Sequence, residues 1–280
     1  MRRVVAQIPH GFQAGSSWIR QATVQELSGY DEQLIVSTQN FSPPIKTSLL
    51  LERVVEFTNL PPNLDLLETI RELPVGDRIT LILHLRKITF GSTLYCTIQC
   101  PLCTANLSLD LSIDSLLQPA NPNPQTTYPL KLDGHNLTIR PLRGSDLEDL
   151  TITQTPLPNI ANLSERLLRS AILISDPALP ELLSSQFQEQ LSTTLSQIDS
   201  QADLTLNITC PSCNKIFQSS LDVENFFFQE ATSRYPQLER EVHWIALHYH
   251  WSEKDIMSLA SSKRKRYVKL INASLSGESV

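Results

Sequence analysis

Two short stretches with the same pattern, Cys100-Pro-Leu-Cys103 and Cys210-Pro-Ser-Cys213, decide how the chain is organised. Each is a Cys-Pro-x-Cys turn, and the two sulfurs of one tight turn can reach the same metal ion. Two such turns supply four thiolates, which is a complete tetrahedral set for zinc. A site with four protein ligands has no position for water or substrate. The pattern therefore predicts a structural zinc ion rather than a catalytic one.

The sequences that flank the two turns are also alike. Between the pairs lie residues 104–209, far more than in a compact zinc ribbon, so the spacing alone is weak evidence. However, alternating apolar residues typical of strands precede and follow each turn. At an offset of 110 residues, Ile98 matches Ile208 and Leu111 matches Leu221. We therefore expect one shared four-cysteine site at the tips of two similar hairpins.

The alternatives to a metal site are two pairs of reduced thiols, or disulfide bonds. Disulfides are disfavoured because the N-terminus has a basic start and only a brief apolar run, which is not typical of a secretory signal. The fifth cysteine, Cys96, aligns with Leu206 at the same offset. It is expected to be a small strand residue rather than a ligand.

The composition narrows the class of protein. The chain has 280 residues, of which 41% are hydrophobic and 19% charged, which is enough for one or two domains with a substantial core. The formal net charge of −6 gives no bulk electrostatic argument for nucleic-acid binding. No run of about 18 apolar residues occurs, so no transmembrane helix is expected.

A similar order of elements occurs twice along the chain. Residues 128–140 are typical of a hairpin around Asp133-Gly134, and the turn after it resembles residues 26–31. A leucine-rich helix, a further helix and a cysteine turn come next in both halves. In the first half, the helix from Arg78 to about Lys87 is apolar over more than half its circumference and is expected to be central.

We infer an internal duplication with an α+β, mainly helical fold, in which the metal pins one repeat to the other. The expected division is an N-terminal arm (1–19), a first repeat (20–117), a proline-rich linker (118–127), a second repeat (128–227) and a C-terminal helical segment (228–280).

The C-terminal segment is expected to carry a partner-binding surface. A helix starting at Asn225 should end near Tyr235-Pro236, and a second one should run from Gln237 to His250 with two apolar faces. The candidate partner-binding residues are Trp244, Leu247 and Trp251, with Lys263, Arg264 and Arg266 from a basic run. Because a run of four charges is usually a solvated helix face, nucleic acid is not the favoured ligand.

Two blocks of sequence resemble the baseplate proteins of contractile phage tails and related contractile injection systems. The first block runs from Leu73 to Gly91, ahead of the first cysteine turn, and the second from Arg240 to Tyr267. They are similar to a family related to phage baseplate hub assembly chaperones, and the resemblance covers most of residues 20–272. It implies a non-enzymatic assembly factor or minor baseplate component. Baseplate or hub proteins would be the partners, in the bacterial cytoplasm or in the assembled particle.

Two other functions stay open at this point. A zinc-ribbon nucleic-acid-binding protein would be retained on DNA or RNA columns with a steep salt dependence, but the acidic net charge disfavours it. An enzyme such as a hydrolase, with a site dispersed along the chain, is the other alternative. The sequence shows no Gly-rich phosphate loop, nucleophile elbow or His-Glu-x-x-His pattern that would point to one.

Overall fold

The computed structural model describes residues 1–123, 125–152, 160–175, 179 and 183–276. Within them the fold is mixed α+β, and the strands form four small antiparallel sheets instead of one large sheet. Two of these sheets have three strands and two are hairpins. No helix among these residues is long and apolar enough to cross a membrane.

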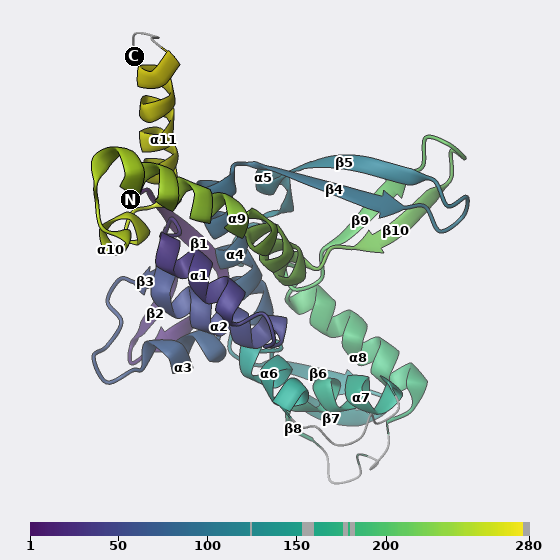
Figure 1. The fold of residues 1–280 in the computed structure, drawn as a ribbon. Coiled ribbons are helices and arrows are strands. Elements are labelled where there is room, and N and C mark those ends of the chain that lie inside the picture. The colour runs from purple at the N-terminus through teal and green to yellow at the C-terminus, as the bar shows by residue number, and fades with distance from the viewer. Residues whose placement is uncertain (124, 153–159, 176–178, 180–182, 277–280) are drawn as a thin grey trace.

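The chain begins with a three-stranded sheet in the order β1-β2-β3 (Figure 1). Its strands are β1 (Arg3–Ala14), β2 (Ser17–Gln25) and β3 (Val55–Phe57), and between β2 and β3 lie α1 (Gly29–Ser37) and α2 (Pro43–Val54). The helix α1 begins with a capping box, in which the side chains of Ser28 and Asp31 each accept the other residue's backbone N–H.

The expected N-terminal arm at residues 1–19 is wrong. Residues 3–14 form β1, which pairs antiparallel with β2, and the side chains of Ala6 and Ile8 are fully buried. The register shifts between Gln7 and Phe12, which marks an irregularity in the strand. This break interrupts the apolar–polar alternation from which a strand is predicted. The first structural unit therefore starts at β1 and not at residue 20.

The helix α4 (Val75–Phe90) is central, as its apolar circumference predicts. It follows the short α3 (Leu66–Arg71) and packs on β1, β2 and α9. Leu81, Ile82 and Leu85 of α4 have no exposed surface. Contacts on several sides explain why apolar residues cover more than one face of this helix.

A hairpin and a linker complete the first half. The hairpin consists of β4 (Thr93–Gln99) and β5 (Asn106–Ser112) and is followed by α5 (Ile113–Leu116). In the linker, the described residues form no helix or strand. It nevertheless lies against the first sheet, because the Asn121 N–H donates to the Pro9 carbonyl at 3.0 Å.

The second half, like the first, begins with a three-stranded antiparallel sheet. Its predicted hairpin is confirmed, and Asp133 and Gly134 at the turn have φ values of 47° and 84°. The third strand of this sheet pairs with the second, as β3 pairs with β2. The elements are β6 (Tyr128–Leu132), β7 (His135–Ile139), α6 (Gly144–Ile152), α7 (Ile160–Ser170), β8 (Ile172–Ile174), α8 (Ser185–Ile198), β9 (Thr205–Thr209) and β10 (Ile216–Ser220).

The C-terminal part consists of α9 (Val223–Tyr249), α10 (Glu253–Met257) and α11 (Ser261–Ser276). The expected division at Tyr235-Pro236 is wrong, since α9 is one helix of 27 residues with Pro236 inside it. The helix packs against α1, α2, α4 and α11, and these contacts stabilise it across the proline.

Among the residues that the structure describes, the buried ones form one large cluster and three smaller ones. The large cluster joins the first sheet, α4 and the start of α9, and the second lies between β6, β7, α7 and α8. The third surrounds the cysteines, and the fourth lies between α9, α10 and α11. The hairpins β4-β5 and β9-β10 project from one side of the body, and α11 projects from it in a different direction (Figure 1).

Candidate metal centre

The two cysteine turns close their hairpins in the same way. In the first, the Cys100 N–H donates to the Ala105 carbonyl at 2.9 Å, and the Thr104 N–H donates to the Cys100 carbonyl at 2.9 Å. In the second, the bonds at the equivalent positions measure 2.9 and 2.8 Å. The residue after the second cysteine is left-handed in both turns, with φ of 59° at Thr104 and 57° at Asn214. A β-branched residue rarely adopts this conformation, so the two turns share a specific backbone geometry.

The turns converge as expected. The four sulfurs of Cys100, Cys103, Cys210 and Cys213 all lie within 4.8 Å of one another. The Cys100 and Cys213 sulfurs are 3.9 Å apart, and those of Cys103 and Cys210 are 3.6 Å apart. A tetrahedral ion with metal–sulfur bonds of about 2.3 Å requires sulfur–sulfur distances of about 3.8 Å. A disulfide requires about 2.05 Å, so these cysteines are free thiols whose geometry can hold a metal ion.

Protons are shared unevenly among these thiols. Burial raises the pKa of Cys210, but hydrogen bonds from the backbone N–H groups of Cys213 and Ser212 and from the neighbouring thiols together lower it to about 6. At Cys103 the Ala105 backbone favours the thiolate, whereas burial and the neighbouring thiols oppose it and raise the pKa to about 12. Four thiols this close cannot all ionise by themselves. A cation among them would remove this repulsion.

A small apolar cluster encloses the centre. Cys100 and Cys210 have no exposed surface, and Leu107, Ile208 and Phe217 pack around them. Both hairpins contribute ligands and apolar side chains. Because the four thiols fill a tetrahedral set, an ion bound here would have no open coordination position.

Cys96 lies outside this group, as expected. It sits opposite Leu109 in the β4-β5 hairpin and packs against the large core cluster. Burial and the nearby Asp110 raise the pKa of its thiol. Among the described residues, the four other cysteines are the one group of three or more metal-ligating side chains close enough to share an ion.

The predicted aromatic partner-binding residues divide into two groups. Trp244, on α9, donates its indole N–H to Asn272 of α11 at 3.1 Å, and Leu247 is 55% exposed. Trp251 instead packs against the rings of Tyr249 and Tyr267 in the fourth buried cluster. Trp244 and Leu247 therefore lie near one surface, whereas Trp251 mainly holds the C-terminal helices together.

The basic residues expected to bind a partner also divide into exposed and buried ones. The expectation that Arg264 binds a partner is wrong. Lys263 and Arg266 are exposed, but Arg264 has no exposed surface. Its guanidinium contacts Glu32 of α1 and lies 3.1 Å from Glu241 of α9. Two buried carboxylates from distant parts of the chain hold this side chain inside the molecule, so it does not reach a partner.

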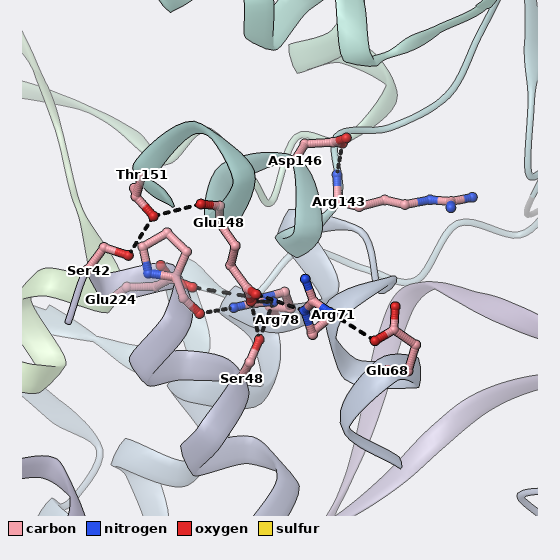
Figure 2. Close-up of polar contacts among 11 residues, drawn as sticks. Ser42, Ser48, Glu68, Arg71, Arg78, Arg143, Asp146, Glu148, Thr151 and Glu224 are labelled. Carbon is pink, nitrogen blue, oxygen red and sulfur yellow. Dashed lines mark hydrogen bonds and ion pairs between the residues drawn. The ribbon is translucent and has the colours of Figure 1, made fainter. Parts of the chain in front are cut away.

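A second buried arginine, Arg78 of α4, joins the two halves (Figure 2). Its guanidinium donates to the Ser48 hydroxyl at 2.8 Å and to the Pro44 carbonyl at 2.6 Å, and it lies 3.4 Å from Glu148 of α6. Gly144, at the start of α6, has to lack a side chain. A Cβ there would lie 1.7 Å from the Arg78 guanidinium.

Arg78 and Arg264 occupy equivalent places. Each is the fourth residue of its helix, and a short capped helix and an isolated β-bridge precede that helix. Through these bridges, α4 docks beside the N-terminus of α6, and α11 docks beside the N-terminus of α1. The pairs α3–α4 and α10–α11 thus use the same arrangement on two different helices.

A third buried polar group lies where β1, α4 and the end of α8 meet. Asp77 accepts the backbone N–H groups of His10 and Gly11 at 2.8 and 2.7 Å, and Asp199 accepts the Gly76 N–H at 2.9 Å. The His10 Nε2 lies 3.2 Å from Asp199. Burial raises the pKa of Asp77 to about 7. Burial disfavours the charged form of His10, but the hydrogen bond and charge of Asp199, together with the charge of Asp77, raise its pKa.

The fold and site together define an α+β protein. Two cysteine-tipped hairpins, one from each half, bring their four cysteines together in a geometry that can bind one metal ion. The chain belongs to the T4 bacteriophage base plate protein family, whose model matches residues 63–228, more than half of the sequence. The predicted resemblance to phage baseplate proteins is thereby confirmed. The match includes both cysteine turns and residues 73–91, the first block that resembles baseplate proteins. It ends before the second such block, residues 240–267. Comparisons with curated proteins and with solved structures gave no match.

Proposed function

We propose that this protein is a non-enzymatic assembly factor or minor structural component of the baseplate of a contractile phage tail-like injection system. The family match over residues 63–228 carries the proposal. The partners are baseplate or hub proteins, and a relationship to hub assembly chaperones is the specific form that we favour. The protein acts in the bacterial cytoplasm or within the assembled particle.

In this proposal the four-cysteine centre binds one structural zinc ion. Zinc takes four thiolates tetrahedrally and has no redox chemistry of its own. The sulfur separations of 3.6 and 3.9 Å are close to what four zinc–thiolate bonds require. The ion pins the hairpin of one half to that of the other, beside an apolar cluster to which both hairpins contribute.

The proposal also includes an internal duplication. Its support is the order strand, strand, helix, helix, strand in each half, followed in each by a cysteine-tipped hairpin. The first repeat begins at β1 and the second at β6, with residues 118–127 as the linker. Residues 228–280 are the C-terminal helical segment, into which α9 continues from the second repeat.

Deletion of the gene, followed by electron microscopy of the particles, tests the function. We expect tails without baseplates, or no assembled tails, because baseplate assembly precedes growth of a functional particle in this proposal. Mass spectrometry of purified wild-type particles then distinguishes a component, which is present, from an assembly factor, which is absent. Normal particles with complete baseplates in the deletion strain would contradict the proposal.

A further inference from the structure

The hairpin formed by β4 and β5 has open edges. It projects from the body (Figure 1) and is a two-stranded sheet, whereas the sheets β1-β2-β3 and β6-β7-β8 each have a third strand. Among the residues that the structure describes, no third strand pairs with β4 or β5. An open edge presents backbone N–H and C=O groups, so the occupant that fits it chemically is another extended strand.

The hydrogen bonds at the two ends of the hairpin show which residues of β4 face its open edge. At the tip, the Cys100 N–H donates to the Ala105 carbonyl, and at the base the Ile113 N–H donates to the Ser92 carbonyl. In an antiparallel ladder, residues that bond to the partner strand alternate with residues that do not. Both ends therefore assign the bonds with β5 to the even-numbered residues of β4. The residues that face outward are Thr93, Tyr95, Thr97 and Gln99.

The open edge of β4 lacks the usual protection. Natural edge strands commonly carry a lysine, a proline or a bulge that prevents pairing with another chain. The strand β4 (Thr93–Gln99) has no charged residue, no proline and no register shift against β5. Its outward-facing backbone groups have no partner among the described residues. Threonine, tyrosine and isoleucine also favour strands, so this edge is suited to pairing.

The other edges of the cysteine hairpins are less suited. In β5, the outward-facing residue opposite Tyr95 is Asp110, which carries a charge. The strands β9 and β10 have five residues each, against seven in β4, and Lys215 directly precedes β10. Fewer residues offer fewer backbone bonds, and charges at an edge oppose pairing. We therefore consider β4 alone.

The strand β4 is complementary to a second copy of itself. Cys96 is its middle residue, and a twofold axis through Cys96 would pair the two copies antiparallel. Tyr95 then lies opposite Thr97 of the second copy, and Thr93 lies opposite Gln99. All four outward-facing residues thus meet an outward-facing residue, and no like charges meet. An axis through Tyr95 or Thr97 would instead leave one end of the strand unpaired.

We infer that β4 pairs edge to edge with β4 of a second copy of this chain, with the twofold axis at Cys96. The two hairpins then form one four-stranded antiparallel sheet, and the two bodies lie at its opposite ends. The second copy is the occupant because one uncharged strand supplies a complete set of partners for itself. Self-association through this edge does not depend on the proposed baseplate function.

Proline substitution tests the edge with a matched control. The Thr97 N–H points away from β5, so Thr97→Pro removes one donor per copy from the interface but keeps the bonds within the hairpin. Ser108 lies opposite Thr97 in β5, and its N–H points away from β4, so Ser108→Pro is the same change on the other edge. Circular dichroism and zinc content verify that both variants fold.

Sedimentation velocity over a range of concentrations measures the dimer. The wild type should reach twice the chain mass of 31.5 kDa. Thr97→Pro should raise the dissociation constant roughly tenfold or more, because two backbone bonds are lost across the interface. Ser108→Pro should dimerise as the wild type does. Hydrogen exchange in the wild type should slow in the peptide 93–99 as the concentration rises, and stay unchanged in 106–112.

Cysteine cross-linking tests the position of the axis. Tyr95 and Thr97 have exposed side chains, so both sites are accessible to a mild oxidant. In a Cys96→Ser background, a mixture of the Tyr95→Cys and Thr97→Cys variants should form a disulfide-linked dimer. Each variant alone should form much less, because the axis at Cys96 sets neither residue opposite its own copy. Equal cross-linking by Thr97→Cys alone would overturn the axis at Cys96.

Three results would overturn the pairing itself. The first is a wild type that stays monomeric at all concentrations up to about 100 μM. The second is a dimer that Thr97→Pro leaves unchanged, or that both proline variants weaken equally. The third is a monomeric wild type whose β4 edge is protected from exchange only when a baseplate or hub protein is added, which would assign the edge to a strand of that protein. None of these results bears on the baseplate function, which the gene deletion tests.

Discussion

Replacing Arg264 by leucine should lower the free energy of unfolding by about 3–5 kcal/mol at pH 7. The guanidinium has no exposed surface, and the side chains of Glu32 and Glu241 beside it are 8% and 3% exposed. Leucine leaves both carboxylates buried without a cation. The magnitude is the range typical for removing one member of a buried ion pair, where the remaining charge is uncompensated.

The size of this effect should depend on pH. Burial already raises the pKa of Glu32, and the Arg264 charge opposes that rise. Removal of the charge therefore raises the Glu32 pKa further. A carboxyl whose pKa is higher in the folded than in the unfolded state adds stability as the pH falls through the folded-state pKa. The difference between Arg264→Leu and wild type should shrink from pH 7 to pH 5.

Urea unfolding followed by circular dichroism at both pH values measures the effect. The matched control is Arg266→Leu, two residues further along and exposed, which should stay within about 0.5 kcal/mol of wild type. A loss of less than about 1 kcal/mol for Arg264→Leu at pH 7, or an equal loss for both variants, would refute the placement of Arg264 as a buried structural residue.

Three further predictions concern the metal centre and two buried polar groups, at Asp77 and at Arg78. Cys213→Ser should abolish bound zinc and lower the melting temperature, whereas Cys96→Ser should keep one zinc per chain; equal zinc content in both would count against the four-cysteine site. The contribution of Asp77 to stability should rise by about 1.4 kcal/mol from pH 8 to pH 6, because burial raises its pKa to about 7 and the folded carboxyl takes up a proton that the unfolded one does not. Asp77→Asn should reduce this slope in urea titrations, and an unchanged slope would exclude Asp77 as its source. Gly144→Ala should cost about 1–3 kcal/mol, because the added methyl group displaces the Arg78 guanidinium; wild-type stability would show that the close approach is absent.

Each cysteine turn was predictable because its geometry is local, and the likeness of the two turns predicted their shared site. Each turn needs only four consecutive residues, and the flanking strands repeat the same alternation at an offset of 110 residues. The hairpin at Asp133-Gly134 was predictable for the same reason, since a two-residue turn requires positive φ at adjacent positions. Features that a few neighbouring residues determine can be read from the sequence.

Elements held by distant contacts were not predictable in this way. The pairing of β1 with β2 shifts register near His10, where the chain makes buried polar contacts to α4 and the end of α8. The helix α9 continues through Pro236 because other helices pack along it. In both cases local propensity indicates a break, and tertiary contacts override it.

The burial of Arg78 and Arg264 was missed for a related reason. Lys263 to Arg266 form a run of charges that is typical of a solvated helix face. One of these four side chains is buried because Glu32, 232 residues away in sequence, faces it in the fold. A buried cation is recognised only when its carboxylate partners are located. Sequence alone does not show which member of a basic run has such partners.

Zinc K-edge X-ray absorption spectroscopy of the purified full-length protein tests the central claim most directly. One zinc per chain with four sulfur ligands at about 2.3 Å is the predicted result. Zinc bound through nitrogen or oxygen ligands, or a folded, stable protein that carries no zinc, would contradict the claim that this centre joins the two halves.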